Sequence, residues 1–457
     1  MRLLLLLALL LPLCGPGRAA AVARGARPKA GAVGGDENAT GWSGPEVRVV
    51  RQPNGAVAWQ INGHQNVQPQ FFKVALTHDP HAKDNWSDVD YELQLACKAA
   101  VPVVSFYINE ANVSKYGNTE AGSSWSLFSR SFDPSTEAMF ARVETICPDA
   151  YLWPNIDAWL PPKSCGATPL DNVTLRVSTT GSHYVDYSNF NNAPNSAWLD
   201  CASGHLSRFM ALLDGRFPGK IWGVQVSNLV TTEWFLPGSC TSGSACFELG
   251  DYANSTRDAY CASIGQTHWD DDGCEIPTPA ERINGVAGSA GAGLLATSNS
   301  ARFAAFLATR TADAIAALAR VTKVASNGKA FFATYYGYIL ELSGCRLPAT
   351  GHFAVSRLLA EPAVDGIISP YMYEDSVRLP GGALLPHGVF DSPSLRNKLY
   401  IIEDDSRTAL CFKRTTMNES IPDAWCLGYR QDSFFATRNL LLRNLVTTSL
   451  HFAGSCE

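Results

Sequence analysis

The chain has 457 residues, a formal net charge of −6 at pH 7 and 46% hydrophobic residues. This length does not fix the number of domains, because single barrels with insertions reach it. The composition is that of a globular protein, and the absence of a basic stripe in the sequence argues against nucleic acid as a partner.

The first 21 residues are typical of a secretory signal peptide. Arg2 supplies the positive start, residues 3–13 the apolar centre and Ala19-Ala20-Ala21 the small-residue cleavage site. That centre is too short to cross a bilayer, which needs about 20 apolar residues, and we identify no other membrane anchor in the sequence. We therefore expect a secreted protein or one of the secretory-pathway lumen.

The cysteines and glycosylation signals favour the same compartment. Of 13 cysteines, Cys14 lies in the signal, and the remaining even number can pair in an oxidising environment. Short loops make Cys240–Cys246 and Cys411–Cys426 the simplest predicted pairs. No Cys/His group has zinc spacing, so we predict neither a metal nor another cofactor. Sequons for N-glycosylation occur at Asn38, Asn85, Asn112, Asn172, Asn254 and Asn418.

Two N-terminal segments precede the main domain. Residues 22–45 are rich in Ala and Gly and are predicted to be a flexible leader. In residues 46–69, two alternating apolar runs flank Pro53-Asn54-Gly55, which predicts a β-hairpin.

From residue 70 onward, buried strands alternate with amphipathic helices. This pattern predicts an α/β fold, a (β/α)8 TIM-type barrel over residues 70–457 with the hairpin as a cap. A doubly wound fold would need a glycine-rich turn after its first strand, and the sequence has none there. The predicted strands are 71–78, 101–109, 150–157, 221–227, 329–339, 365–373 and 398–405. The predicted helices are 87–100, 133–147, 195–217, 251–268, 300–324, 351–363 and 433–452, with a side hairpin around 172–179.

Only seven strand–helix units can be identified before the chain stops at Glu457, so an eighth strand could be missing. Two explanations stay open: the N-terminal hairpin closes the barrel in part, or the chain is a fragment.

The active sites of such barrels lie at the C-terminal ends of the strands. Glu233 follows the fourth strand, next to Trp234 and Phe235, and Glu403 ends the seventh strand. The pKa of an acid held among apolar rings rises because its charged form is poorly solvated, which suits Glu233 as a proton donor. Arg407 would favour an ionised Glu403. Two carboxyl groups in these roles are what glycoside hydrolysis needs.

Other interpretations of these residues remain. A lone Glu after a strand is commonly a helix-capping or solvated acid, and the acidic run 403–405 also fits a calcium site. Tyrosines at the ends of strands five and six are commonly core residues.

The stretches "IWGVQVSNLVTTEWF", "DYANSTRDAYCASIGQTHWDDDGCEIPTPAER" and "NKLYIIEDDSRT" resemble the clan A glycoside hydrolases, close to the family-42 type of β-galactosidase. The resemblance covers roughly residues 55–455. It implies a retaining glycosidase with a carbohydrate substrate, in which Glu233 is the acid/base and Glu403 the nucleophile. The substrate-binding residues expected beside them are Asn228, Trp234, Tyr335, Tyr371, Tyr373, Asp404 and Arg407.

A second hypothesis is a catalytically inactive sugar-binding or surface glycoprotein on the same barrel. This hypothesis rests on a departure from the clan, which usually has Asn directly before the acid/base Glu. In this chain Thr232 occupies that position.

Overall fold

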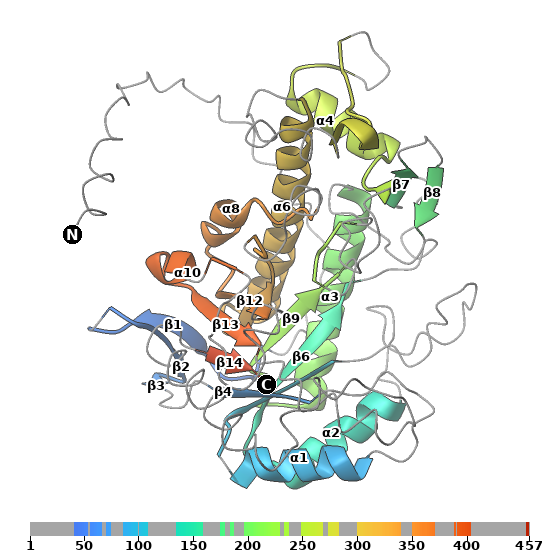
Figure 1. Ribbon diagram of the computed structural model, residues 1–457. Coiled ribbons are helices and arrows are strands. Elements are labelled where there is room, and N and C mark those ends of the chain that lie inside the picture. The colour runs from blue at the N-terminus through green and yellow to red at the C-terminus, as the bar shows by residue number, and fades with distance from the viewer. Residues whose placement is uncertain are drawn as a thin grey trace, which may run out of the picture. The chain divides into compact units, whose positions relative to one another are not determined.

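Parallel strands close into a barrel in the computed structural model (Figure 1). The structure describes residues 41–53, 55–65, 70–74, 86–98, 100–107, 134–158, 174–178, 183–186, 196–228, 233–236, 248–267, 273–282, 299–339, 350–370, 388–389, 391–403 and 454–456. Around the barrel the strand order is β11-β12-β13-β14-β4-β5-β6-β9. In chain order these strands are β4 (Gln70–Val74), β5 (Val103–Tyr107), β6 (Tyr151–Asp157), β9 (Gly223–Ser227), β11 (Phe331–Tyr335), β12 (Gly366–Pro370), β13 (Leu399–Glu403) and β14 (Gly454–Cys456).

The eighth strand that sequence analysis did not identify is β14. It pairs in parallel with β13, where Glu403 lies opposite Cys456, and with β4, where Ser455 lies opposite Gln70. The hairpin does not close the barrel, because it forms a separate sheet and β14 is the closing strand. The sequence Gly-Ser-Cys gives no strand signal, since it is short and has no β-branched or aromatic residue. The predicted helix 433–452 lies outside the described residues.

The predicted N-terminal hairpin is confirmed. β1 (Val47–Arg51) and β2 (Val57–Ile61) are antiparallel, and a short third strand, β3 (His64–Gln65), extends the sheet. The backbone N–H of Val47 donates to the carbonyl of Lys329, 2.9 Å away, just before β11. The hairpin therefore covers the amino-terminal end of the barrel.

The folded unit begins before the hairpin, inside the segment predicted as a leader. Trp42 is buried, and both the backbone N–H and the hydroxyl of Ser43 donate to the Asp214 carboxylate, at 2.9 and 2.7 Å. Residues 41–45 are therefore packed onto the helix that carries Asp214.

Helices cover the outside of the strands. The long helices α3 and α6 pack against each other, as Figure 1 shows, and α1 packs against α2. The predicted side hairpin is confirmed and belongs to a small sheet of β7, β8 and β10. The bounds are α1 (Trp86–Lys98), α2 (Pro134–Ile146), α3 (Ser196–Arg216), α4 (Asn254–Ser263), α6 (Asn299–Ala325), α8 (Val355–Leu359) and α10 (Asp391–Leu395), with β7 (Thr174–Ser178), β8 (His183–Asp186) and β10 (Glu248–Leu249).

Two apolar clusters follow from the alternation of side chains along each strand. Val224 and Val226 of β9 point outward into the larger cluster, between the strands and the helices. The smaller cluster lies inside the barrel and under the hairpin, and contains Trp59, Trp153 and Phe331. Residues that alternate with the outward set, such as Gln225, therefore point into the barrel.

Two disulfides lie among the described residues. Cys97–Cys147 joins the ends of α1 and α2, and Cys261–Cys274 joins the end of α4 to the chain that follows it, with Cα–Cα distances of 5.6 Å in both. The predicted pairs Cys240–Cys246 and Cys411–Cys426 lie outside the described residues. Within the part of the chain that is described, no helix has the length and apolar character needed to cross a membrane.

Candidate active site

Glu403 stands at the carboxyl end of β13, at the mouth of the barrel. Its Oε2 accepts a hydrogen bond of 2.7 Å from the hydroxyl of Tyr335, the last residue of β11. Strand β12 separates these two strands, so the bond reaches across the inner side of the barrel wall. Tyr335 is almost fully buried, whereas Glu403 is partly exposed. The arrangement fixes the carboxylate while keeping it open to the mouth.

Glu233 reaches the same mouth from the loop after β9. Its Oε1 accepts a hydrogen bond of 3.2 Å from the hydroxyl of Tyr338, three residues beyond the end of β11. The carboxylate is partly exposed and Tyr338 is buried.

The two tyrosines bring the two glutamates into one cluster. The ring centroids of Tyr335 and Tyr338 lie 6.4 Å apart, with their planes at 90°. Since each hydroxyl donates to one glutamate, Glu233 and Glu403 both lie within one hydrogen bond of the same pair of rings. Two acids separated by 170 positions in the sequence (403 − 233) thus share one end of the barrel.

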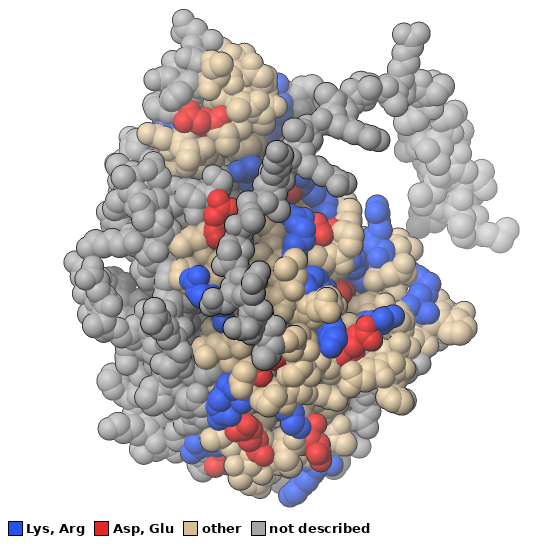
Figure 2. Space-filling model, turned by 180° about the vertical axis from the view of Figure 1, so that it is seen from behind, with Lys and Arg blue, Asp and Glu red and all other residues tan. Residues whose placement is uncertain are grey.

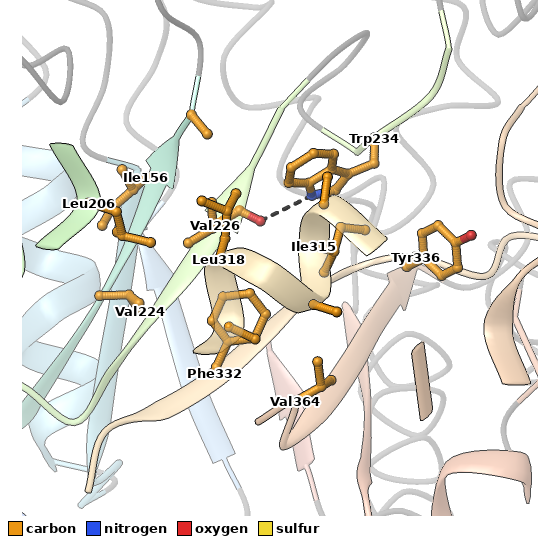
Figure 3. Packing of buried hydrophobic residues seen from close by; sticks show 14 of the residues in the cluster. Ile156, Leu206, Val224, Val226, Trp234, Ile315, Leu318, Phe332, Tyr336 and Val364 are labelled. Atoms are coloured by element: carbon orange, nitrogen blue, oxygen red, sulfur yellow. Dashed lines mark hydrogen bonds between the residues drawn. The ribbon is translucent and has the colours of Figure 1, made fainter. Parts of the chain in front are cut away.

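Trp234 lies in the core and not on the expected sugar site. Its indole is fully buried and its Nε1–H donates to the hydroxyl of Thr334 at 2.9 Å and to the carbonyl of Val226 at 3.2 Å. Figure 3 shows the ring turned toward Val226 and Ile315 of the outer core. The prediction that Trp234 lines the sugar site is therefore wrong, because its ring is buried in the outer core cluster.

The backbone explains why neighbouring side chains separate in this way. Trp234 has a positive φ of 62°, a conformation that costs a non-glycine residue about 1–2 kcal/mol. Its N–H donates to the carbonyl of Asn228 at 2.8 Å, which folds the loop back onto the end of β9. Burial of the indole offsets the strained backbone, and Glu233 is left facing the mouth. Asn228 is itself wholly buried, so it supports the loop from below.

A polar wall lies inside the barrel below the glutamates. We use that term for Ser105, Asn155, Gln225 and Ser227, on the neighbouring strands β5, β6 and β9; all four are buried. Ser227 Oγ donates to Asn155 Oδ1 at 2.6 Å. Ser105 Oγ, Asn155 Nδ2 and Gln225 Nε2 have no partner within the described part of the chain.

Each such buried, unpaired polar atom costs about 1–3 kcal/mol, so these atoms are suited to bind water or a hydroxylated ligand. Sequence analysis did not single out this wall, although the polar residues on otherwise apolar strands were its visible signal.

Several expected site residues cannot be compared with the structure. Tyr371, Tyr373, Asp404 and Arg407 lie outside the described residues. The described residues contain no group of three or more His, Cys, Asp or Glu side chains able to hold a metal ion. The site seen in the structure therefore consists of Glu233, Glu403, Tyr335, Tyr338 and the polar wall.

Comparison with known proteins adds no family assignment. No protein-family model matches the chain, and no curated protein matches it.

Among solved structures, the chain is similar to the catalytic domain of β-amylase from Paenibacillus polymyxa, with 11% identity, 86% of this chain and 92% of that chain covered, and a TM-score of 0.49. It is also similar to β-galactosidase from the psychrophilic Marinomonas ef1 (10% identity, 68% and 42% covered, TM-score 0.39) and to β-mannanase from the blue mussel Mytilus edulis (10%, 86% and 98%, TM-score 0.37). The chain spans 42% of that β-galactosidase. The barrel assignment rests on this chain's own strand pairing.

Proposed function

We propose that this protein is a secreted glycoside hydrolase that cleaves a glycosidic bond with retention of configuration, using Glu233 and Glu403. The observation that carries the proposal is the pair of glutamates at one barrel mouth, each holding the hydroxyl of one of two adjacent tyrosines. Glycoside hydrolysis with retention needs two carboxyl groups on either side of the scissile bond, about 5–5.5 Å apart.

In the first step, Glu233 donates a proton to the glycosidic oxygen while Glu403 attacks the anomeric carbon. The bond to the leaving group breaks as the bond to Glu403 forms. In the second step, Glu233 takes a proton from water, the water oxygen attacks the anomeric carbon, and the Glu403–sugar bond breaks. Each carboxyl group returns to its starting state.

The surroundings of each acid support this division of roles. The phenol of Tyr335 donates to Glu403 without bringing a second charge, which orients a carboxylate for attack. Glu233 sits on a loop whose neighbours Trp234 and Phe235 are buried, so its backbone is anchored while its carboxyl group faces the mouth. The assignment of acid and nucleophile follows the resemblance noted from the sequence.

The polar wall supports a sugar as the bound molecule. Its unpaired hydroxyl and amide groups match the alternating donors and acceptors of a sugar ring, whereas an apolar substrate would leave them unsatisfied. A β-galactoside is the substrate that the sequence resemblance favours. Tyr371, Tyr373, Asp404 and Arg407 remain proposed contacts.

Secretion is part of the proposal. The signal-like N-terminus, the two disulfides and the sequons agree with an oxidising, glycosylating compartment. Asn254, the first residue of α4, is exposed and so accessible to a glycan.

The test is hydrolysis of a panel of aryl glycosides, beginning with the β-galactoside, by the wild type and by Glu233→Gln and Glu403→Gln. We expect each substitution to lower kcat by about 10²–10⁴-fold, because each removes a proton-transfer or covalent step. Glu144→Gln is the matched control, since Glu144 is an exposed acid in a surface ion pair with Arg216. It should retain wild-type rates.

Product stereochemistry and azide separate the two roles. The first-formed sugar should keep the substrate's configuration by NMR. Azide needs no general base, so with Glu233→Ala it should give a glycosyl azide of retained configuration, and with Glu403→Ala one of opposite configuration. If the wild type cleaves no glycoside but binds sugars, the inactive sugar-binding protein replaces this proposal.

A further inference from the structure

His352 lies beside the proposed site but is closed off from it. It is fully buried, in the segment between β11 and α8. Its ring stacks on Phe235, with centroids 4.4 Å apart and planes at 3°, and on Tyr336, at 4.7 Å and 28°. It therefore packs between the segment that carries Glu233 and the segment that follows β11.

One ring nitrogen of His352 holds the segment that carries Tyr338. Nδ1 accepts hydrogen bonds from the backbone N–H groups of Gly337 and Tyr338, both at 3.2 Å. A nitrogen that accepts two such bonds carries no hydrogen, so the ring is neutral with its hydrogen on Nε2. Burial lowers the pKa of His352 to about 3, which keeps this neutral form throughout the pH range of a glycosidase assay.

The other side of the ring meets the loop that carries Glu233. The backbone of Glu233 and Trp234 interacts with His352 and raises its pKa, less strongly than burial lowers it. The Nε2–H group of His352 forms no hydrogen bond with the described residues. Its interaction with this backbone is therefore electrostatic.

A backbone bond reinforces the same junction. The N–H of Leu236 donates to the carbonyl of Thr350 at 3.1 Å. The residue after Thr350, Gly351, has a φ of 81°, and a Cβ built on it would lie 3.0 Å from the Leu236 side chain. Only glycine allows this approach without strain, so the segment 350–352 is closely fitted against the Glu233 loop.

We propose that His352 is a positioning residue, which sets the Glu233 carboxyl group relative to Tyr338. Three contacts link these groups: His352 accepts from the Tyr338 backbone N–H, the Tyr338 hydroxyl donates to the Glu233 carboxylate, and the His352 ring stacks on Phe235, two residues after Glu233. The inference rests on the proposed function of Glu233 as proton donor. His352 touches no substrate, because its ring is enclosed by protein.

Substrates with different leaving groups distinguish a variant in which Glu233 is misplaced from one that is only less stable. Proton donation matters greatly for a poorly acidic leaving group such as methanol or unsubstituted phenol, and little for 2,4-dinitrophenol, which departs without it. A misplaced Glu233 therefore slows the first kind of substrate selectively. A variant that merely unfolds more readily loses the same fraction of activity on both.

The variants remove the polar links in steps. His352→Phe keeps a ring to stack on Phe235 and Tyr336 but removes both nitrogens. His352→Asn places an oxygen near the position of Nδ1, so it can still accept from the Gly337 and Tyr338 N–H groups. Val364→Ala is the control for destabilisation, because Val364 is a buried core residue outside the site. Glu233→Gln gives the largest leaving-group dependence that can be expected.

For His352→Phe we expect kcat to fall by about 10–100-fold on the phenyl glycoside and by less than about threefold on the dinitrophenyl glycoside. KM should change little, and His352→Asn should recover part of the loss. Equal losses on both substrates, or no loss, for whichever of the two variants folds would overturn the inference. If Glu233→Gln itself shows no leaving-group dependence, the proposed role of Glu233 fails instead, and His352 loses its function with it.

Discussion

At the scale of single residues, the site depends on how three tyrosines, one at the end of β11 and two just beyond it, point in different directions. Tyr335 points into the barrel, and Tyr336 points outward, where its hydroxyl donates to the carbonyl of Gly351 at 2.9 Å. Gly337, with a φ of 89°, then turns the chain so that Tyr338 returns to the mouth. Strand alternation followed by one glycine turn therefore places the Tyr335 and Tyr338 phenols, which bind the two glutamates, at the same mouth of the barrel.

Removing either phenol hydroxyl tests this arrangement. Tyr335→Phe and Tyr338→Phe each delete one hydrogen bond to a glutamate. A hydrogen bond to a charged group contributes about 1.5–3 kcal/mol, so we expect kcat/KM to fall by about 10–150-fold. Steady-state kinetics on the best aryl glycoside measure the change.

Tyr151→Phe is the control for this pair, because Tyr151 begins β6 at the opposite end of the barrel. It should leave kcat/KM within about twofold of wild type, as surface-like substitutions far from a site do. Wild-type rates in both site variants would show that the phenols do not act on the glutamates.

Trp234 shows what a residue-level sequence argument can miss. An aromatic side chain just after a strand can line the mouth or join the core, and both are compatible with the letters "TEWF". The positive φ of Trp234 directs its side chain into the core. The hydrogen bond from its N–H to the carbonyl of Asn228 holds the backbone in that conformation. The prediction for the neighbouring Glu233 needed only its position after β9, and its carboxylate lies beside the Tyr338 hydroxyl.

At the scale of secondary-structure elements, the N-terminal hairpin is part of the barrel core. Trp59 of β2 meets Trp222 edge-on with ring centroids 4.5 Å apart, and Trp222 also contacts Trp153 and Phe331 at 5.3 and 4.1 Å. These rings fill the amino-terminal end of the barrel. The hairpin thus closes the end opposite the proposed active site, where packing serves stability.

Truncation of the Trp59 side chain should destabilise the whole barrel. Trp59→Ala removes a fully buried side chain, and we expect the free energy of unfolding to fall by about 3–5 kcal/mol. Urea denaturation followed by tryptophan fluorescence or circular dichroism measures it.

Gln60→Ala is the matched control, since Gln60 is the next residue of β2 and points to the other face. Its unfolding free energy should stay within about 0.5 kcal/mol of wild type. Equal effects of the two substitutions would mean that the hairpin is not packed on the barrel.

At the scale of the whole molecule, surface charge is mixed and long-range covalent links hold the fold. Figure 2 shows Lys and Arg interspersed with Asp and Glu among the described residues of one face. Surface ion pairs such as Arg216–Glu144 contribute little each. The disulfides act differently, because they constrain the unfolded chain.

The two disulfides should differ in strength. Cys97–Cys147 closes a loop of sequence separation 50, and Cys261–Cys274 one of 13. Chain entropy predicts about 4 kcal/mol of stabilisation for the first and about 3 for the second. We expect the Cys97→Ser/Cys147→Ser variant to melt at a lower temperature than the Cys261→Ser/Cys274→Ser variant, in differential scanning calorimetry.

Reduction of the wild type should lower its melting temperature by more than either pair of substitutions. A reduced protein that melts at the wild-type temperature would contradict a role for both bridges.

The sequence by itself determined the order of the first seven barrel strands, the barrel class and the hairpin cap, and it predicted two glutamates at the strand ends, because each depends on local periodicity or on position after a strand. A strand that is buried on both faces has a continuous apolar sequence, and turn residues mark where it ends.

Only the tertiary structure decided which strand closes the barrel, where Trp234 packs, that Tyr335 and Tyr338 each bind one glutamate, and that His352 packs beside the Glu233 loop. These features rest on contacts between residues far apart in the chain, such as Cys456 beside Glu403 and His352 beside Phe235. Such contacts leave no periodic signal in the sequence, since neither partner needs a particular neighbour along the chain to form them.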